Sequence, residues 1–319
     1  MTARALVDRA GSVLGLVLVA AIFGIAVGPQ FFAPANIGLI ARQTAIVGMA
    51  ALGMTMVIVG GGIDLSVGSV IALSTVVVAV LLNRTPLPWL AALGGIGAAM
   101  LCGAMNGLLI TQLRVVPFIV TLGTMLVVRG AAKGLAEERR IEAPATWLND
   151  LLRSRTEGVL GLLPSGIWLL AALALVVGGV FGYTRFGRRL FAIGSNERMA
   201  RLCGVAVERC KVAMYTIAGG FAGLAGVLQF SKLSVGDPTV AVGLELDVIA
   251  AVIIGGGSLL GGRGTVLGTL VGATIMTLIQ IGCSQKGLPN WVQQIITGGI
   301  IVVAVALDRT RTGRVSHGL

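Results

Sequence analysis

Apolar residues fall into ten long runs, separated by short stretches rich in polar residues or glycine. A helix needs about 20 mostly apolar residues to cross the hydrocarbon core of a membrane. The runs lie at residues 12–31, 37–60, 66–83, 88–110, 116–135, 165–183, 211–231, 244–257, 264–283 and 288–307. The run at 244–257 is short for a crossing, and the run at 66–83 begins beside a glycine-rich break. The pattern predicts an all-α, polytopic transmembrane helical bundle of about ten spans, some of them short or broken.

Composition supports a membrane protein and excludes several soluble classes. Of 319 residues, 56% are hydrophobic and 12% are charged, whereas soluble domains average about 25% charged residues. A soluble enzyme, a disordered chain and a nucleic-acid binder are therefore excluded, despite the net charge of +11. The single histidine, His317, lies in the tail, and the four cysteines have no CxxC spacing. We therefore expect no metal site and no catalytic residues.

The distribution of basic residues predicts the orientation. Arginine and lysine gather in the loop 184–211 and at both chain ends, whereas the loop 136–164 balances basic and acidic residues. Cytoplasmic loops of membrane proteins carry an excess of arginine and lysine. The sequence therefore predicts a cytoplasmic segment 1–11, a transmembrane domain 12–307 and a cytoplasmic tail 308–319. The loop 184–211 would be cytoplasmic and the loop 136–164 periplasmic.

Two segments of the chain have nearly the same sequence. VIVGGG at residues 57–62 returns as VIIGGG at 252–257. Duplicated halves with glycine-interrupted helices are typical of transporters, whose substrate route lies near the interruptions. Small residues also recur four apart, which favours close helix packing in lipid. These residues are Gly95, Ala99, Gly103, Gly107, Gly219, Gly223, Gly264, Gly268 and Gly272.

Ionisable residues inside a membrane are costly and often functional. Asp64 and Ser66 follow the break at Gly62, where they can cap the next helix or line a polar route. Glu245 and Asp247 open the short run and suit the positive end of a helix dipole. The candidate pore or helix-break residues are Gly62, Asp64, Ser66, Asn106, Thr121, Glu245 and Asp247. Arg42 and Arg129 lie near outer ends of spans, where they can reach the membrane interface.

The basic loop contains a short amphipathic helix. Asn196 suits an N-cap, Glu197 the first turn and Gly204 the helix stop, and Met199 and Leu202 lie near one face. This helix suits either an anionic lipid surface or a groove in a cytoplasmic partner. Its candidate residues are Asn196, Glu197, Arg198, Met199, Ala200, Arg201, Leu202 and Gly204.

One segment resembles a nucleotide-binding loop but lacks its chemistry. GSLLGGRG at 257–264 has neither the lysine nor the serine or threonine that bind phosphates and Mg²⁺ in a Walker A loop. The sequence therefore predicts a turn there, and the chain carries no visible catalytic apparatus.

Three blocks together resemble a known family. The first is GGIDLS at 61–66, and the second joins NGLLI at 106–110 to PFIVTLGT at 117–124. The third contains GSNE at 194–197, GLELDVIAAV at 243–252 and GGRGT at 261–265. The chain resembles the membrane permease subunits of bacterial ATP-binding-cassette importers for monosaccharides, the ribose permease type, which is related to branched-chain amino-acid permeases.

The resemblance implies a transport subunit of the bacterial inner membrane with partners. It implies a second permease copy or paralogue, a cytoplasmic ATPase subunit and a periplasmic sugar-binding protein. ATP and Mg²⁺ would bind to the ATPase, while this chain would bind no cofactor. The segment from Glu197 to Gly204 would be the coupling helix. Two alternatives remain: the same machinery carrying a branched-chain amino acid, or an ion-driven transporter with Asp64 as the coupling carboxylate.

Overall fold

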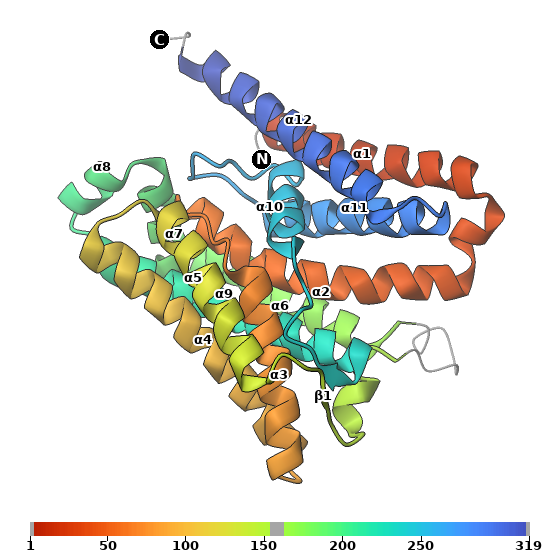
Figure 1. Ribbon diagram of the computed structural model, residues 1–319. Helices are drawn as coiled ribbons and strands as arrows, with labels where there is room; N and C mark the ends of the chain where they lie inside the picture. Colours follow the sequence, from red (N-terminus) through yellow and green to blue (C-terminus); the bar gives the residue numbers. More distant parts are fainter. Residues whose placement is uncertain (1–2, 154–162, 317–319) are drawn as a thin grey trace.

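The computed structural model describes residues 3–153 and 163–316, and helices make up most of this part of the chain (Figure 1). The elements are α1 (Ala3–Val27), η1 (Pro29–Phe32), α2 (Pro34–Val59), α3 (Val67–Arg84), α4 (Pro88–Leu113), α5 (Pro117–Leu135), β1 (Ile141–Glu142), η2 (Trp147–Asp150), α6 (Ser165–Tyr183), α7 (Arg185–Ser195), α8 (Glu197–Leu202), α9 (Val207–Leu233), β2 (Val235–Gly236), α10 (Leu244–Ile254), α11 (Val266–Gln285) and α12 (Asn290–Ser316).

The predicted all-α membrane architecture is confirmed. Each of the ten apolar runs contains a helix, and α2, α3, α4, α5, α6, α9 and α11 are long and apolar enough to cross a membrane. Helices α1 and α12 contain shorter apolar stretches, Gly11–Val27 and Asn290–Val303. Helix α10 has 11 residues, too few to cross the hydrocarbon core alone.

The structure differs from the sequence prediction at several places. Helix α1 begins at Ala3 and α12 continues to Ser316, so both helices extend into the segments 1–11 and 308–319 that were predicted to flank the transmembrane domain. The first run extends to residue 31, but α1 ends at Val27 because Gly28 has a φ of 95° and the tighter η1 helix follows. Helix α7 was not predicted, and it begins where the Thr184 hydroxyl accepts the amide of Gly187. A short antiparallel pairing joins β1 to β2 across the end of the bundle.

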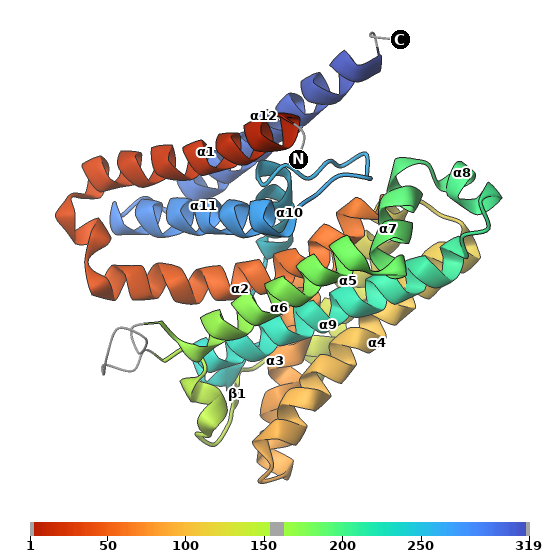
Figure 2. The same ribbon diagram turned by 180° about the vertical axis from the view of Figure 1, so that it is seen from behind.

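Two views of the ribbon show how the helices are arranged (Figures 1 and 2). Helices α1, α11 and α12 form one side, α3, α4, α5 and α9 form the other, and α2 contacts both α9 and α11. The beginning of α1 and the end of α12 lie toward the same end of the bundle as α7 and α8, whereas β1 lies toward the opposite end.

Small residues allow the helices to approach closely. A β-carbon at Gly103 would overlap the Tyr215 carbonyl oxygen, and one at Gly219 would overlap that of Ala99, so α4 and α9 touch backbone to backbone. Helices α10 and α11 meet in the same way, because Gly272 lies against the carbonyl group of Ala251. The predicted use of the small residues in packing is confirmed.

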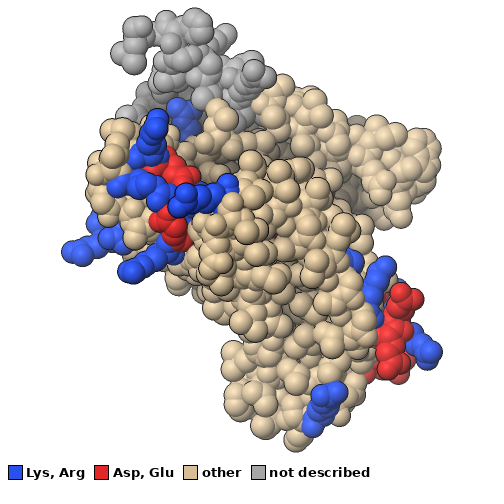
Figure 3. Space-filling view, turned by 60° about the vertical axis from the view of Figure 1, so that its left-hand side comes forward, with Lys and Arg blue, Asp and Glu red and all other residues tan. Residues whose placement is uncertain are grey.

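The surface separates charge from a broad apolar belt. On the face in Figure 3, charged side chains gather at two opposite ends, and uncharged residues cover the surface between them. Large apolar side chains are exposed in the intervening helices, including Leu101 on α4, Leu126 on α5 and Leu175 on α6, which are 72%, 67% and 79% exposed. Such an extensive exposed apolar surface indicates contact with lipid.

Candidate translocation and coupling sites

Helix α8 has defined signals at both ends. The Asn196 side chain accepts the amide of Met199 at 3.0 Å, which satisfies one of the free amides of the first turn. The amide of Val205 donates to the Ala200 carbonyl at 3.1 Å across Gly204, whose φ is 81°. This is a glycine-terminated helix end. The predicted cap and stop are both confirmed.

Ion pairs tie α8 to the beginning of α9. Lys211 contacts Glu197 at 2.7 Å, and Arg201 forms ion pairs with both Glu208 and Glu197. The hydrogen bond to Glu208 and the nearby negative charges raise the pKa of the Arg201 guanidinium above its ordinary value. On the inner side, Ala200 packs among buried residues of α7 and α9. Helix α8 is therefore attached to the bundle on one face.

The other face of α8 presents apolar and basic groups. Met199 is 54% exposed and Leu202 is 76% exposed. Arg198 is also exposed on this six-residue helix, whereas the exposed Arg201 is taken up by its ion pairs with Glu197 and Glu208. An exposed apolar pair beside a basic side chain suits insertion into a complementary surface.

The first helix break follows α2. The amide of Gly62 donates to the Val57 carbonyl at 2.8 Å, and Gly61 between them has a φ of 77°, so the glycines end the helix. Asp64 is 3% exposed and accepts both the amide of Ser66, at 2.8 Å, and its hydroxyl, at 2.6 Å. Ser66 occupies the N-cap position of α3 but does not cap it with its side chain. Asp64 therefore fixes the turn before α3.

Helices α4, α5 and α9 place polar side chains around this break. The Asn106 amide donates to the Ser66 hydroxyl at 2.9 Å. The hydroxyls of Thr121 and Tyr215 donate to the Ile63 carbonyl at 3.2 and 3.3 Å. The structure thus brings together Gly62, Asp64, Ser66, Asn106 and Thr121. Tyr215 was not predicted as a site residue, although it is a lone tyrosine within an apolar span beside a row of small residues.

The second helix break precedes α10. Glu245 accepts the amide of Gly243 at 3.2 Å, in agreement with the predicted first-turn position. Asp247 instead accepts a hydrogen bond from Gln280 of α11. A β-carbon at Gly68 of α3 would overlap both the Glu245 carboxylate and the Ala241 carbonyl oxygen. The two breaks therefore adjoin one another inside the bundle.

Two arginines hold the chain segment that enters the second break. Arg129 was expected at the membrane interface, but it donates to the carbonyls of Pro238 and Val240 at 3.0 and 2.7 Å. Arg140 forms an ion pair with Asp237 at 2.7 Å. Burial raises the pKa of Asp237, but hydrogen bonds from Thr239 and Arg140 outweigh this effect and hold that pKa below its ordinary value.

The loop between α10 and α11 is a turn, as predicted. The amide of Gly257 donates to the Val252 carbonyl at 2.8 Å across Gly256, whose φ is 92°. This is the same helix end that follows α2. The repeated VIxGGG sequence therefore has the same local structure at both positions. The amide of Gly262 also donates to the Val59 carbonyl at 2.9 Å and joins this loop to the first break.

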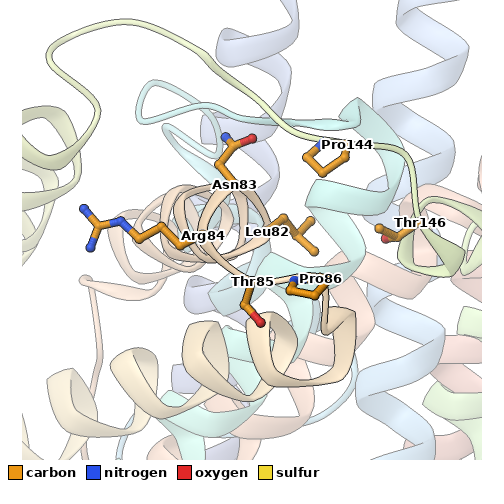
Figure 4. Close-up of a pocket in the computed structure, with 7 residues that line it drawn as sticks. All are labelled: Leu82, Asn83, Arg84, Thr85, Pro86, Pro144 and Thr146. Carbon is orange, nitrogen blue, oxygen red and sulfur yellow. The ribbon is translucent and has the colours of Figure 1, made fainter.

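Metal-ligating residue types and a pocket are the remaining features that bear on a functional site. Among the side chains that the structure describes (residues 11–153, 163–303, 305 and 306), no three of histidine, cysteine or acidic type lie close enough to hold a metal ion. A pocket of about 360 Å³ is lined by residues 82–86, Pro144 and Thr146 (Figure 4). It lies beside the end of α3 and contains none of the candidate site residues.

Comparison with known proteins identifies the family. Residues 36–305 match the family described as the permease component of the branched-chain amino acid transport system. The chain is 40% identical to the ribose import permease protein RbsC of Bacillus subtilis, over 96% of this chain and 94% of that protein. It is 35% identical to RbsC of Escherichia coli K12, over 96% and 95% of the two chains.

A third relative is the L-arabinose ABC transporter permease protein AraH of Azospirillum brasilense, which is 36% identical over 96% of this chain and 89% of its own length. A search of solved structures gave no match. The extent of these similarities places the chain in the family of branched-chain amino acid transport system permease components.

Proposed function

We propose that this chain is the membrane subunit of an ATP-binding-cassette importer for a monosaccharide. Relatives similar along almost the whole chain are named as ribose and L-arabinose permeases, and this supports a sugar as the cargo. The chain would form half of the pathway, with a second copy or a paralogue forming the other half. ATP and Mg²⁺ would act on a separate ATPase, and a periplasmic binding protein would deliver the sugar.

The observation that carries this proposal is the geometry of α8. The helix is capped, ion-paired to α9 and exposed on its apolar side through Met199 and Leu202. A rigid projecting helix of this kind suits a groove in an ATPase better than a lipid surface, because it is short and its apolar face is small. Residues Asn196 to Gly204 would transmit the closing of the ATPase to the bundle.

The two adjoining helix breaks are the proposed place for the sugar route. Broken helices free backbone polar groups within the membrane, and transporters use such groups beside the substrate pathway. The residues proposed to line or shape this route are Gly62, Asp64, Ser66, Asn106, Thr121, Glu245 and Asp247. A neutral sugar needs hydrogen-bonding groups rather than paired opposite charges, which fits these side chains.

The distribution of arginines supports a specific orientation. The end of the bundle that carries α7 and α8 contains the arginine-rich segment 184–211, and the positive-inside rule places such segments in the cytoplasm. Both termini, 1–11 and 308–319, would then be cytoplasmic, and the loop 136–164 periplasmic. The location would be the bacterial inner membrane.

Reconstitution in liposomes tests this function. The chain, its cognate ATPase and its binding protein are expected to import one of the sugars for which its relatives are named, which are ribose, L-arabinose, fructose and D-allose, and only when ATP is present. Uptake of a branched-chain amino acid in place of these sugars would contradict the proposed cargo. Uptake that continues without ATP and is abolished by an uncoupler would instead favour an ion-driven transporter.

A further inference from the structure

Three segments meet close to the beginning of α8, with almost no side chain between them. They are the end of α2 at Val59–Gly62, the end of α7 at Gly194–Ser195, and Gly261–Gly262 of the loop before α11. A β-carbon at Gly194 would overlap the Val59 carbonyl oxygen and lie 2.5 Å from the Gly262 nitrogen. A β-carbon at Gly261 would lie 2.9 Å from the α-carbons of both Gly61 and Gly194. We call Gly61, Gly194, Gly261 and Gly262 the glycine junction.

Each of the three segments that form the glycine junction continues into a candidate functional element. Ser195 and its neighbour Asn196 alone separate Gly194 from the first residue of α8. Gly61 lies three residues before Asp64 of the first break. The loop that carries Gly261 continues from α10, whose first turn contains Glu245. The junction therefore joins the proposed coupling helix to both broken helices.

The junction has little capacity to absorb movement. Side chains at a helix contact can change rotamer when one helix shifts, but three backbones in direct contact have no such freedom. The hydrogen bond from the Gly262 amide to the Val59 carbonyl also joins two of the three segments, which are far apart in the sequence. Two of the segments also have a fixed backbone shape. Their glycines adopt left-handed φ values, which are 77° at Gly61, 85° at Gly261 and 70° at Gly262. A displacement of α7 therefore has to move both neighbouring segments.

We propose that Gly194 is a positioning residue, through which movement of α8 reaches both helix breaks at once. This inference rests on the proposed function, because it requires α8 to be moved by an ATPase. In this arrangement the ATPase needs only one docking helix to act on the two breaks. A larger side chain at Gly194 would push the three segments apart. The ATPase would still hydrolyse ATP, but the movement of α8 would no longer reach the helix breaks, and transport would be lost.

The test compares Gly194→Ala with Gly182→Ala in the complete complex with the ATPase and the binding protein. Gly182 lies at the end of α6, and a β-carbon there would meet nothing within 4 Å. Gly194→Ala is expected to bind the ATPase normally and to lower the sugar transported per ATP hydrolysed at least tenfold, while Gly182→Ala keeps the wild-type ratio. An unchanged ratio in Gly194→Ala, or an equal loss of hydrolysis and transport, would overturn the inference.

A second measurement does not depend on the variant folding. In the wild-type complex, hydrogen exchange is followed without nucleotide and again after one round of ATP hydrolysis has left ADP and vanadate trapped in the ATPase. Residues 60–66 and 256–265 are expected to change their protection together with α7 and α8. A change confined to α7 and α8 would refute the role of the junction but leave the proposed function intact. A wild-type chain that fails to bind an ATPase would contradict the proposed function itself and, with it, this inference.

Discussion

Replacing Leu202 by alanine should weaken docking of the ATPase without disturbing the bundle. Leu202 is the last residue of α8 and is 76% exposed, so its side chain is available to a partner. Alanine is at least as favourable as leucine in a helix, and the cap at Asn196 is untouched. The variant therefore removes apolar contact area and leaves the shape of α8 unchanged.

The size of the effect follows from the exposed fraction of Leu202. The substitution removes three carbon atoms, and each buried methylene group contributes about 0.8 kcal/mol, or about 2.4 kcal/mol for complete burial. Docking can newly bury only the 76% that is exposed, which leaves about 1.8 kcal/mol. Because about 1.4 kcal/mol corresponds to a tenfold change in affinity, the Kd for the ATPase should rise roughly 20-fold.

Binding of the purified ATPase to the chain in nanodiscs measures this change directly. Leu175→Ala is the matched control, because Leu175 is 79% exposed but lies on α6, in the apolar belt. The control should bind the ATPase with the wild-type Kd. A change of less than threefold for Leu202→Ala, or an equal change for both variants, would refute the assignment of α8 as the docking helix.

Three further predictions concern the bundle and the two sites. Asn196→Ala should destabilise α8 by about 1 kcal/mol, because the first-turn amide loses its acceptor, and faster hydrogen exchange within α8 measures this. Gly219→Ala should lower the free energy of unfolding by about 1–3 kcal/mol, because the added methyl group forces α4 and α9 apart. Gly97→Ala, whose methyl group would meet open space, should not lower the melting temperature, because alanine is more favourable than glycine inside a helix. Asp237→Asn should lower the melting temperature, because charge-assisted hydrogen bonds are lost. Since the folded-state pKa of Asp237 is lowered, this difference should persist above pH 3.8 and shrink only as the pH falls further; a constant difference at every pH would contradict it.

Most of the helical architecture could be predicted because lipid imposes a simple rule. Every backbone polar group inside the hydrocarbon core must be satisfied within a helix or by the protein around it, so long apolar runs predict helices. The ends of α8 were also predictable, because Asn196 and Gly204 act through local hydrogen bonds with residues three to five positions away. Interactions of this kind depend on sequence spacing alone.

The contacts that build the two sites depend on distant residues and were harder to predict. Tyr215 donates a hydrogen bond to the Ile63 carbonyl, although the two residues are 152 positions apart in the chain. Arg129 donates to the Val240 carbonyl, which is 111 positions away. The pattern of apolar residues says which helices cross the membrane but not which faces meet. The Arg129 side chain was therefore expected at the membrane interface, whereas in the structure it satisfies carbonyls of an irregular segment.

The pairing of β1 with β2 and the helix α7 were missed for a related reason. Strands of two residues, Ile141–Glu142 and Val235–Gly236, have no periodicity to detect, and they pair only because the bundle brings them together. Helix α7 contains several arginines, so the segment was interpreted as a polar loop. It is an amphipathic helix, and its buried face includes Leu190 and Ile193.

Sugar uptake by liposomes that contain this chain, with and without its partners, tests the central claim most directly. The chain alone should neither hydrolyse ATP nor accumulate any sugar against a gradient. Addition of the ATPase, the binding protein and internal ATP should produce accumulation of the cognate monosaccharide. Accumulation by the chain alone, driven by an ion gradient, would contradict the view that this subunit supplies a pathway and a docking helix while its partners supply energy and selectivity.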